Sequence, residues 1–149
     1  MRYAIVVAVL LLALGSGSAK AQLDPYKDYD TSDAVWQITT VKVDANMGDD
    51  YLEGIKKTWV AASKVAKELG QIEEYAIYRS DLPQSGDFNL LLVVKFKDTA
   101  DLAPSKAKYD AFMKKWGEKR VKETRAISKD YPSMRKITGE YLLRKITIK

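Results

Sequence analysis

Two residue types are missing from this chain of 149 residues: cysteine and histidine. Without cysteine there is no disulfide, no thiolate nucleophile, no thiolate metal site and no acylated lipoprotein cysteine. Without histidine the chain lacks the commonest general base and the usual protein ligand of zinc, copper and haem iron. We therefore expect neither a metal nor another cofactor, and any catalysis would have to use Asp, Glu, Tyr, Lys or Arg.

Long apolar runs are also scarce, and the sequence contains one, residues 4–14 (AIVVAVLLLAL). It is shorter than the roughly 20 residues that a bilayer-spanning helix needs. A short basic start precedes it, and a small-x-small pattern, Ala19-Lys20-Ala21, follows. This combination predicts a cleaved secretory signal over 1–21, with an uncleaved anchor as the alternative. We expect a periplasmic or secreted bacterial protein that begins at Gln22 and has no transmembrane anchor after cleavage.

Charge is distributed unevenly along the chain. Residues 22–103 carry 9 basic and 15 acidic side chains, whereas residues 104–149 carry 14 basic and 5 acidic ones. In the second part, basic and acidic residues alternate at helical spacing, which is typical of a solvated helix. The alternative is a surface for anionic lipid or polyanion, made by Lys114, Lys115, Lys119, Arg120, Lys122 and Arg125. Nucleic acid is not expected, because the chain is predicted to be exported.

Hydrophobic periodicity divides the remainder into a lead-in and one domain. Residues 22–33 are polar and aspartate-rich, which predicts a flexible N-terminal segment ahead of a domain over 34–149. Apolar alternation predicts strands over 34–44, 72–80, 88–98 and 139–149. Apolar residues three and four apart predict a helix over 50–69, capped by Asp50 and closed by Gly70. A second helix is predicted from Ser105, with a buried stripe at Tyr109, Phe112, Met113 and Trp116.

The order of these elements predicts an α+β, ferredoxin-like βαββαβ fold. Its four-stranded antiparallel sheet carries two helices on one face, and the first and third strands lie at the centre. Both of these strands are apolar on both faces, although two helices cover only one face. The other face would expose Trp36, Ile38, Leu91 and Val93. We therefore expect a homodimer in which a second copy covers this face.

The segments VWQITTVKVD, DDYLEGIKKTWVAASKVAKELG, EEYAIYRS, FNLLLVVKFKD and ITGEYLLRKITIK together resemble the dimeric α/β-barrel superfamily. That group includes antibiotic-biosynthesis monooxygenase-like domains, and the resemblance is to uncharacterised secreted bacterial members. It covers 34–149 and rests on the pattern of elements, without a signature motif. It implies the fold and the dimer. Haem-binding members generally use histidine, which this chain lacks, so that only a tyrosinate or lysine ligand would remain.

Cofactor-free oxygenases of this superfamily bind a polyphenol between sheet and helices, using Asn, Trp, Tyr and Arg side chains. The resemblance therefore suggests these ligand-pocket candidates, although none matches position by position: Trp36, Trp59, Tyr75, Tyr78, Asn89 and Arg144. Each also has a structural interpretation, in the core, at an interface or at a strand end. Tyr75 and Tyr78 lie on opposite faces of one strand, so at most one faces a given pocket. Arg144 either extends to the edge of the sheet or pairs with an acid or an anionic ligand.

Three functions are compatible with the sequence, which leaves open whether the protein is an enzyme. The first is binding or cofactor-free oxidation of a small hydrophobic or aromatic compound. The second is a non-catalytic role as a dimeric interaction or scaffolding protein. The third is binding of an anionic surface through the basic second helix. An apolar pocket of about 300 Å³ or more would favour the first function, and a solidly packed sheet–helix layer would favour the second.

Overall fold

The computed structural model describes residues 22–82 and 85–149, and the predicted signal, residues 1–21, lies outside the described residues. The strands are β1 (Tyr29–Val43), β2 (Glu74–Arg79), β3 (Leu90–Phe96) and β4 (Arg135–Ile148). The α-helices are α1 (Gly48–Ile55), α2 (Ala61–Glu68), α3 (Lys106–Trp116) and α4 (Glu118–Ser128). A π-helical turn, η1 (Lys56–Val60), joins α1 to α2, and there are two 3₁₀ turns, η2 (Thr99–Leu102) and η3 (Tyr131–Ser133).

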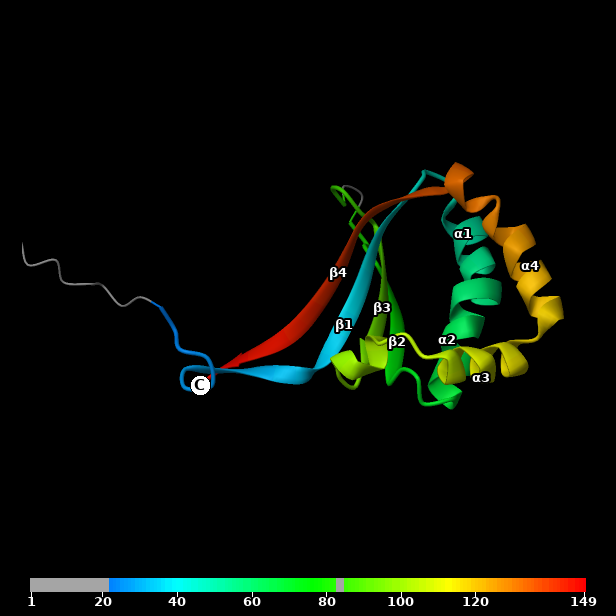
Figure 1. Ribbon diagram of the computed structural model, residues 1–149. Coiled ribbons are helices and arrows are strands. Elements are labelled where there is room, and N and C mark those ends of the chain that lie inside the picture. The colour runs from blue at the N-terminus through cyan, green and yellow to red at the C-terminus, as the bar shows by residue number, and fades with distance from the viewer. Residues whose placement is uncertain (1–21, 83–84) are drawn as a thin grey trace, which may run out of the picture.

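The four strands form one antiparallel sheet in the order β2-β3-β1-β4. The helices lie on one side of it, as Figure 1 shows. This arrangement confirms the predicted α+β, ferredoxin-like fold, with the first and third strands at the centre. Among the described residues, no helix combines the length and the apolar character that crossing a bilayer would take.

The hydrophobic core lies between the sheet and the helices. Val41 of β1 and Leu90 of β3 face Tyr51 and Ile55 of α1, and all four side chains are buried. Because side chains alternate along a strand, every second residue of the central strands points into this layer. Burying each large apolar side chain contributes about 1.5–3 kcal/mol, so this layer supplies the main stabilisation of the fold.

The first helical segment differs from the prediction at its start. It begins at Gly48, with Met47 at the N-cap and no side-chain cap, although Asp49 and Asp50 in the first turn still favour the positive end of the helix dipole. The prediction of Asp50 as the cap is therefore wrong. At the other end Gly70 has φ +67°, a conformation that glycine adopts without strain, and this confirms the predicted stop.

The second helical region is divided at Gly117, whose φ of +81° separates α3 from α4. The predicted start of α3 near Ser105 is confirmed, and Ser105 is its N-cap, since its side chain accepts a hydrogen bond from the Lys108 backbone N–H. The predicted buried stripe is only partly correct. Trp116 is buried, but Tyr109 is exposed.

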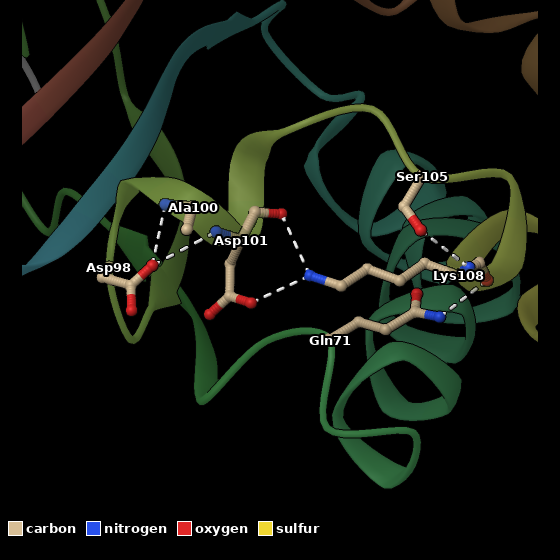
Figure 2. A network of polar contacts seen from close by, with 6 residues as sticks. All are labelled: Gln71, Asp98, Ala100, Asp101, Ser105 and Lys108. Carbon is tan, nitrogen blue, oxygen red and sulfur yellow. Dashed lines mark hydrogen bonds and ion pairs between the residues drawn. The ribbon is translucent and has the colours of Figure 1, made fainter.

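A network of polar contacts joins η2, α3 and the segment that follows α2 (Figure 2). Asp98 accepts hydrogen bonds from two backbone N–H groups of η2, one of them from Asp101. The Lys108 ammonium lies 2.8 Å from the Asp101 carboxylate, and Gln71 donates to the Lys108 carbonyl at 2.7 Å. The Lys108 hydrogen bond lowers the pKa of Asp101. These contacts position both helices against the end of the sheet.

The first and last strands of the chain, β1 and β4, are both longer than predicted. β1 begins at Tyr29, so residues 29–33 belong to a strand rather than to the predicted lead-in. β4 begins at Arg135 rather than Gly139. Because β3 pairs with β1 only from Val35 onward, residues 29–33 and 145–148 form a two-stranded extension, here called the arm. Figure 1 shows the arm leaving the sheet on the side away from the helices.

Candidate functional site

The structure distributes the six candidate residues over several places instead of bringing them together. Trp59 and Tyr75 lie on the helix side of the sheet, where their rings meet edge to face with centroids 5.8 Å apart. Such a contact between two half-buried aromatic rings fills the space between helix and strand. These two residues are therefore packing partners of each other.

Asn89 extends the pairing of the central strands. Its side-chain oxygen accepts from the Val43 backbone N–H at 2.8 Å, and its side-chain nitrogen donates to the Val43 carbonyl at 2.8 Å. The amide thus acts as one further rung of the sheet, just before β3 begins at Leu90. Both ends of the amide are occupied by the backbone of β1, so Asn89 has a structural role.

Arg144 holds the irregular part of β1. Its guanidinium donates from Nη1 to the carbonyl oxygens of Ser32 (2.7 Å) and Asp33 (2.8 Å). These residues lie where the register between β1 and β4 shifts, between Thr31 and Val35. The two hydrogen bonds satisfy carbonyls that the regular ladder leaves unpaired at a bulge. Arg144 therefore pairs with backbone carbonyls. The sequence suggested an acid or an anionic ligand as its partner, and the structure shows neither in that role.

Trp36 and Tyr78 lie on the face of the sheet opposite the helices, here called the open face. Strand register places two apolar or aromatic residues from each strand on it: Trp36, Ile38, Ala76, Tyr78, Leu91, Val93, Tyr141 and Leu143. Thr40, Glu74, Lys95 and Gly139 share this face towards its ends. Of the apolar or aromatic residues, Tyr78 is 59%, Tyr141 51% and Leu143 46% exposed, and the other five are half-buried. The open face is thus apolar on all four strands.

Charged residues lie at the margin of the open face. The Lys95 ammonium lies 5.6 Å from the ring centroid of Trp36 and 2.8 Å from the Glu73 carboxylate. The Glu73 hydrogen bond raises the pKa of Lys95. A cation over an aromatic ring keeps that ring oriented while its charge stays solvated. Apolar side chains, among them Ile38 and Val93, occupy the middle of the face.

A hollow of about 570 Å³ lies at one end of the open face, between the β2–β3 loop and the beginning of β4. Its lining combines apolar side chains with loop backbone: Thr40, Ser85, Gly86, Asp87, Phe88, Lys136, Ile137, Thr138 and Tyr141. The Lys42 ammonium donates to the Gly86 carbonyl at 2.7 Å and to the Ser85 hydroxyl at 3.2 Å. These bonds hold the loop on the open side of the sheet.

A smaller pocket, of about 230 Å³, opens at the same end of the molecule on the helix side. Leu52 and Leu90 supply apolar walls, and Arg79 and Asn89 supply polar ones. It falls below the approximately 300 Å³ at which small-molecule sites begin. Of the six candidates, Asn89 is the one that lines it.

A buried polar cluster between α1, η3 and β4 escaped the sequence reasoning. The rings of Tyr51 and Tyr131 meet edge to face at 5.4 Å, and the Arg135 guanidinium lies 5.6 Å from the Tyr131 ring centroid. The Tyr131 hydroxyl hydrogen-bonds the Thr58 hydroxyl at 2.5 Å. Burial raises the pKa of Tyr51, against the opposing effect of Arg135. No local motif could have indicated this cluster, because its members are far apart in the chain.

Two of the six basic residues considered for anion binding, Lys115 and Arg120, contact neighbouring side chains. Lys115 pairs with Glu68 of α2 at 2.6 Å and lowers the pKa of that carboxyl. Arg120 lies 5.2 Å from the ring centroid of Trp116. This pattern favours the solvated-helix interpretation over an anion-binding surface. In residues 22–82 and 85–149, no three acidic side chains gather in a way that could hold a metal ion.

No protein-family model matches this sequence, and no curated protein matches it. Among solved structures, HapK from Hahella chejuensis is similar, with a TM-score of 0.45 and 13% identity, over 74% of this chain and 91% of that one. A dimeric protein of unknown function with a ferredoxin-like fold, from Bacteroides fragilis, gives 0.42 and 13%, over 80% and 100%. An uncharacterised NIPSNAP-like domain protein from Burkholderia xenovorans gives 0.43 and 13%, over 78% and 85%. At this identity, and with TM-scores below 0.5, the similarities identify no function.

Proposed function

We propose that this protein is a secreted homodimer of the dimeric α/β-barrel type, acting as a non-catalytic interaction or scaffolding protein. The observation that carries the proposal is the open face, where apolar side chains from all four strands lie without a cover from the described chain. Contiguous apolar patches of this kind on a soluble domain mark interaction sites. A twin sheet covers such a face economically, because a two-fold axis brings the same patch from both partners together.

Several candidate residues already have packing or hydrogen-bond partners within the fold, which supports an interaction role over a catalytic one. Trp59 and Tyr75 pack on each other, and the polar groups of Asn89 and Arg144 bond to backbone atoms of β1. Trp36 lies on the face that the partner would cover, and so does Tyr78 of β2. These roles support the scaffolding hypothesis over a catalytic one.

Sedimentation equilibrium of residues 22–149 at micromolar concentration tests the dimer. We expect the mass of two copies. Val93→Asp places a charge in the middle of the open face and should give a folded monomer. As a control, Ala126→Asp places the same charge at an exposed position of α4 and should leave the dimer intact. A folded wild-type monomer at tens of micromolar would refute the proposal.

Small-molecule binding is the second candidate function, and it is favoured by the lining, rather than the size, of the pocket of about 230 Å³ at the loop end. Its leucine walls and the nearby Arg79 suit a small hydrophobic or aromatic compound with one polar or anionic group. Native mass spectrometry of protein exported by its own host tests both candidates. A mass above that of the bare subunits would support the ligand, and a bare dimer whose subunits begin at Gln22 would support export and the interaction role.

A further inference from the structure

The hollow at one end of the open face lies beside two lysines of the same sheet face. Strand register places Lys42 of β1 directly opposite Lys136 of β4. Cross-strand neighbours are close enough to interact, and two like charges in this arrangement repel each other. Within residues 22–82 and 85–149, neither ammonium forms an ion pair with a carboxylate. The sheet therefore keeps a repulsive pair at this end without a carboxylate of its own to relieve it.

The two lysines belong to different walls of the hollow. Lys42 extends to the β2–β3 loop, where its ammonium donates to the Gly86 carbonyl and to the Ser85 hydroxyl, both neutral groups. Lys136 lines the hollow from the beginning of β4, and its side chain is exposed. Asp87 is the acidic residue among the described residues of the lining. Two lysines against one aspartate leave this end of the sheet with a net positive charge.

Aromatic rings form the apolar part of the hollow. A Cβ atom on Gly139 would lie 2.8 Å from the hydroxyl oxygen of Tyr141 and 2.9 Å from its Cε2. The Tyr141 ring therefore lies against the backbone of Gly139, an approach that a residue without a side chain permits. Tyr141 is 51% and Phe88, from the loop, 38% exposed, and both line the hollow. Two accessible rings suit a planar apolar ligand.

Hydroxyl groups supply further polar atoms at the same place. The buried Thr40 hydroxyl lies 2.9 Å from the Thr138 hydroxyl, and either of the two can be the donor. When Thr40 donates, the proton of the Thr138 hydroxyl is available to a ligand. Thr138 is exposed and lines the hollow, as Lys136 does. The beginning of β4 thus offers an ammonium donor and a hydroxyl donor two residues apart.

We propose that the hollow binds a small aromatic carboxylate. The carboxylate accepts from Lys136 and Thr138, and the ring packs on Tyr141. A negative charge there offsets the repulsion between the two lysines, and its hydrogen bond to an ammonium is stronger than one between neutral groups. The volume of about 570 Å³ lies in the range of small-molecule sites. This inference does not rest on the homodimer, and the site is distinct from the smaller pocket beside Arg79.

Titration of residues 22–149 with 2-naphthoate, followed by calorimetry and by amide NMR, tests the site. We expect saturable binding and chemical-shift changes centred on residues 85–88 and 136–141. Naphthalene-2-methanol carries the ring without the charge, and acetate carries the charge without the ring. Each should bind roughly tenfold more weakly than 2-naphthoate, because each lacks one of the two contacts. Shift changes centred on residues 43–52, or no saturable binding at millimolar 2-naphthoate, would overturn the inference.

A substitution at Lys136 separates the charge from the fold. Lys136→Met keeps an unbranched apolar side chain and removes the ammonium. It should weaken 2-naphthoate roughly tenfold and leave the binding of naphthalene-2-methanol unchanged, a division that general damage to the fold would not produce. Lys129→Met makes the same change at an exposed position after α4 and should bind like the wild type.

The same preparations distinguish this inference from the proposed function. Lys136→Met leaves the apolar residues of the open face unchanged, so the dimer and the ligand site can fail separately. A wild-type monomer that binds 2-naphthoate at residues 136–141 would refute the dimer and support the ligand site. A wild-type dimer whose Lys136→Met variant binds 2-naphthoate as tightly as the wild type would overturn the ligand site alone.

Discussion

The two faces of the sheet have similar side chains and opposite surroundings. On the helix side, Leu90 is 3% exposed and packs against Tyr51 and Ile55. On the open side, the adjacent Leu91 is only half-buried, and the exposed Tyr78 lies opposite it on β2. Alternation in a strand therefore shows that both faces require a cover, but it leaves open whether the same chain or another one provides it.

Replacing each of these two leucines by alanine should give the largest difference between the two faces. Leu90→Ala should reduce the free energy of unfolding by about 2–5 kcal/mol, because it opens a cavity in the packed layer. Leu91→Ala should change the unfolding of the monomer much less and should instead weaken the dimer. Urea unfolding below the dimer dissociation constant measures the first effect, and a dilution series by sedimentation measures the second. Equal losses of monomer stability would contradict the difference between the faces.

The sequence was most informative where neighbouring residues determine the structure. Alternation along 88–98 indicated a central strand, and Gly70 indicated the end of the first helical segment; both are confirmed. The predicted patch of Trp36, Ile38, Leu91 and Val93 does lie on the open face. These inferences succeeded because they depend on side-chain periodicity and on the conformational freedom of glycine.

Such reasoning could not predict structure that depends on contacts between residues far apart in the sequence. The aspartate-rich start of the arm resembles a loop, and it becomes a strand because Tyr29–Thr31 pairs with the end of β4. The partners of Arg144 are backbone carbonyls of Ser32 and Asp33, which leave no trace in composition. The contact of Arg135 with Tyr131 likewise depends on how η3 is placed in the fold. These contacts decided which candidate residues have structural roles.

Asn89→Ala is expected to have an intermediate effect, confined to the helix side. It removes both hydrogen bonds to Val43, a residue that is 7% exposed, and leaves its N–H and C=O without those partners. We expect a loss of about 1–3 kcal/mol in the free energy of unfolding. Asn89→Asp keeps an acceptor for the N–H and loses the donor to the carbonyl. Its Val43 amide should therefore exchange with solvent more slowly than in the alanine variant, as measured by NMR; equal exchange rates would show that the amide oxygen contributes nothing.

Asp101→Asn should have the smallest effect, and its pH dependence should identify the cause. The Lys108 hydrogen bond lowers the pKa of Asp101 in the folded state, so the carboxylate stabilises the fold above its unfolded-state pKa, near 4. That stabilisation is lost as the pH falls through the lower, folded-state pKa. Because both side chains are partly exposed, the difference at pH 7 should be no more than about 1 kcal/mol, and it should shrink towards zero in acid. Lys108→Met should remove the same pH-dependent part of the stability. Neither substitution should weaken the dimer, because the network in Figure 2 joins η2, α3 and the segment after α2, away from the open face. A loss that stays constant from pH 7 down to pH 2 would instead assign the effect to packing.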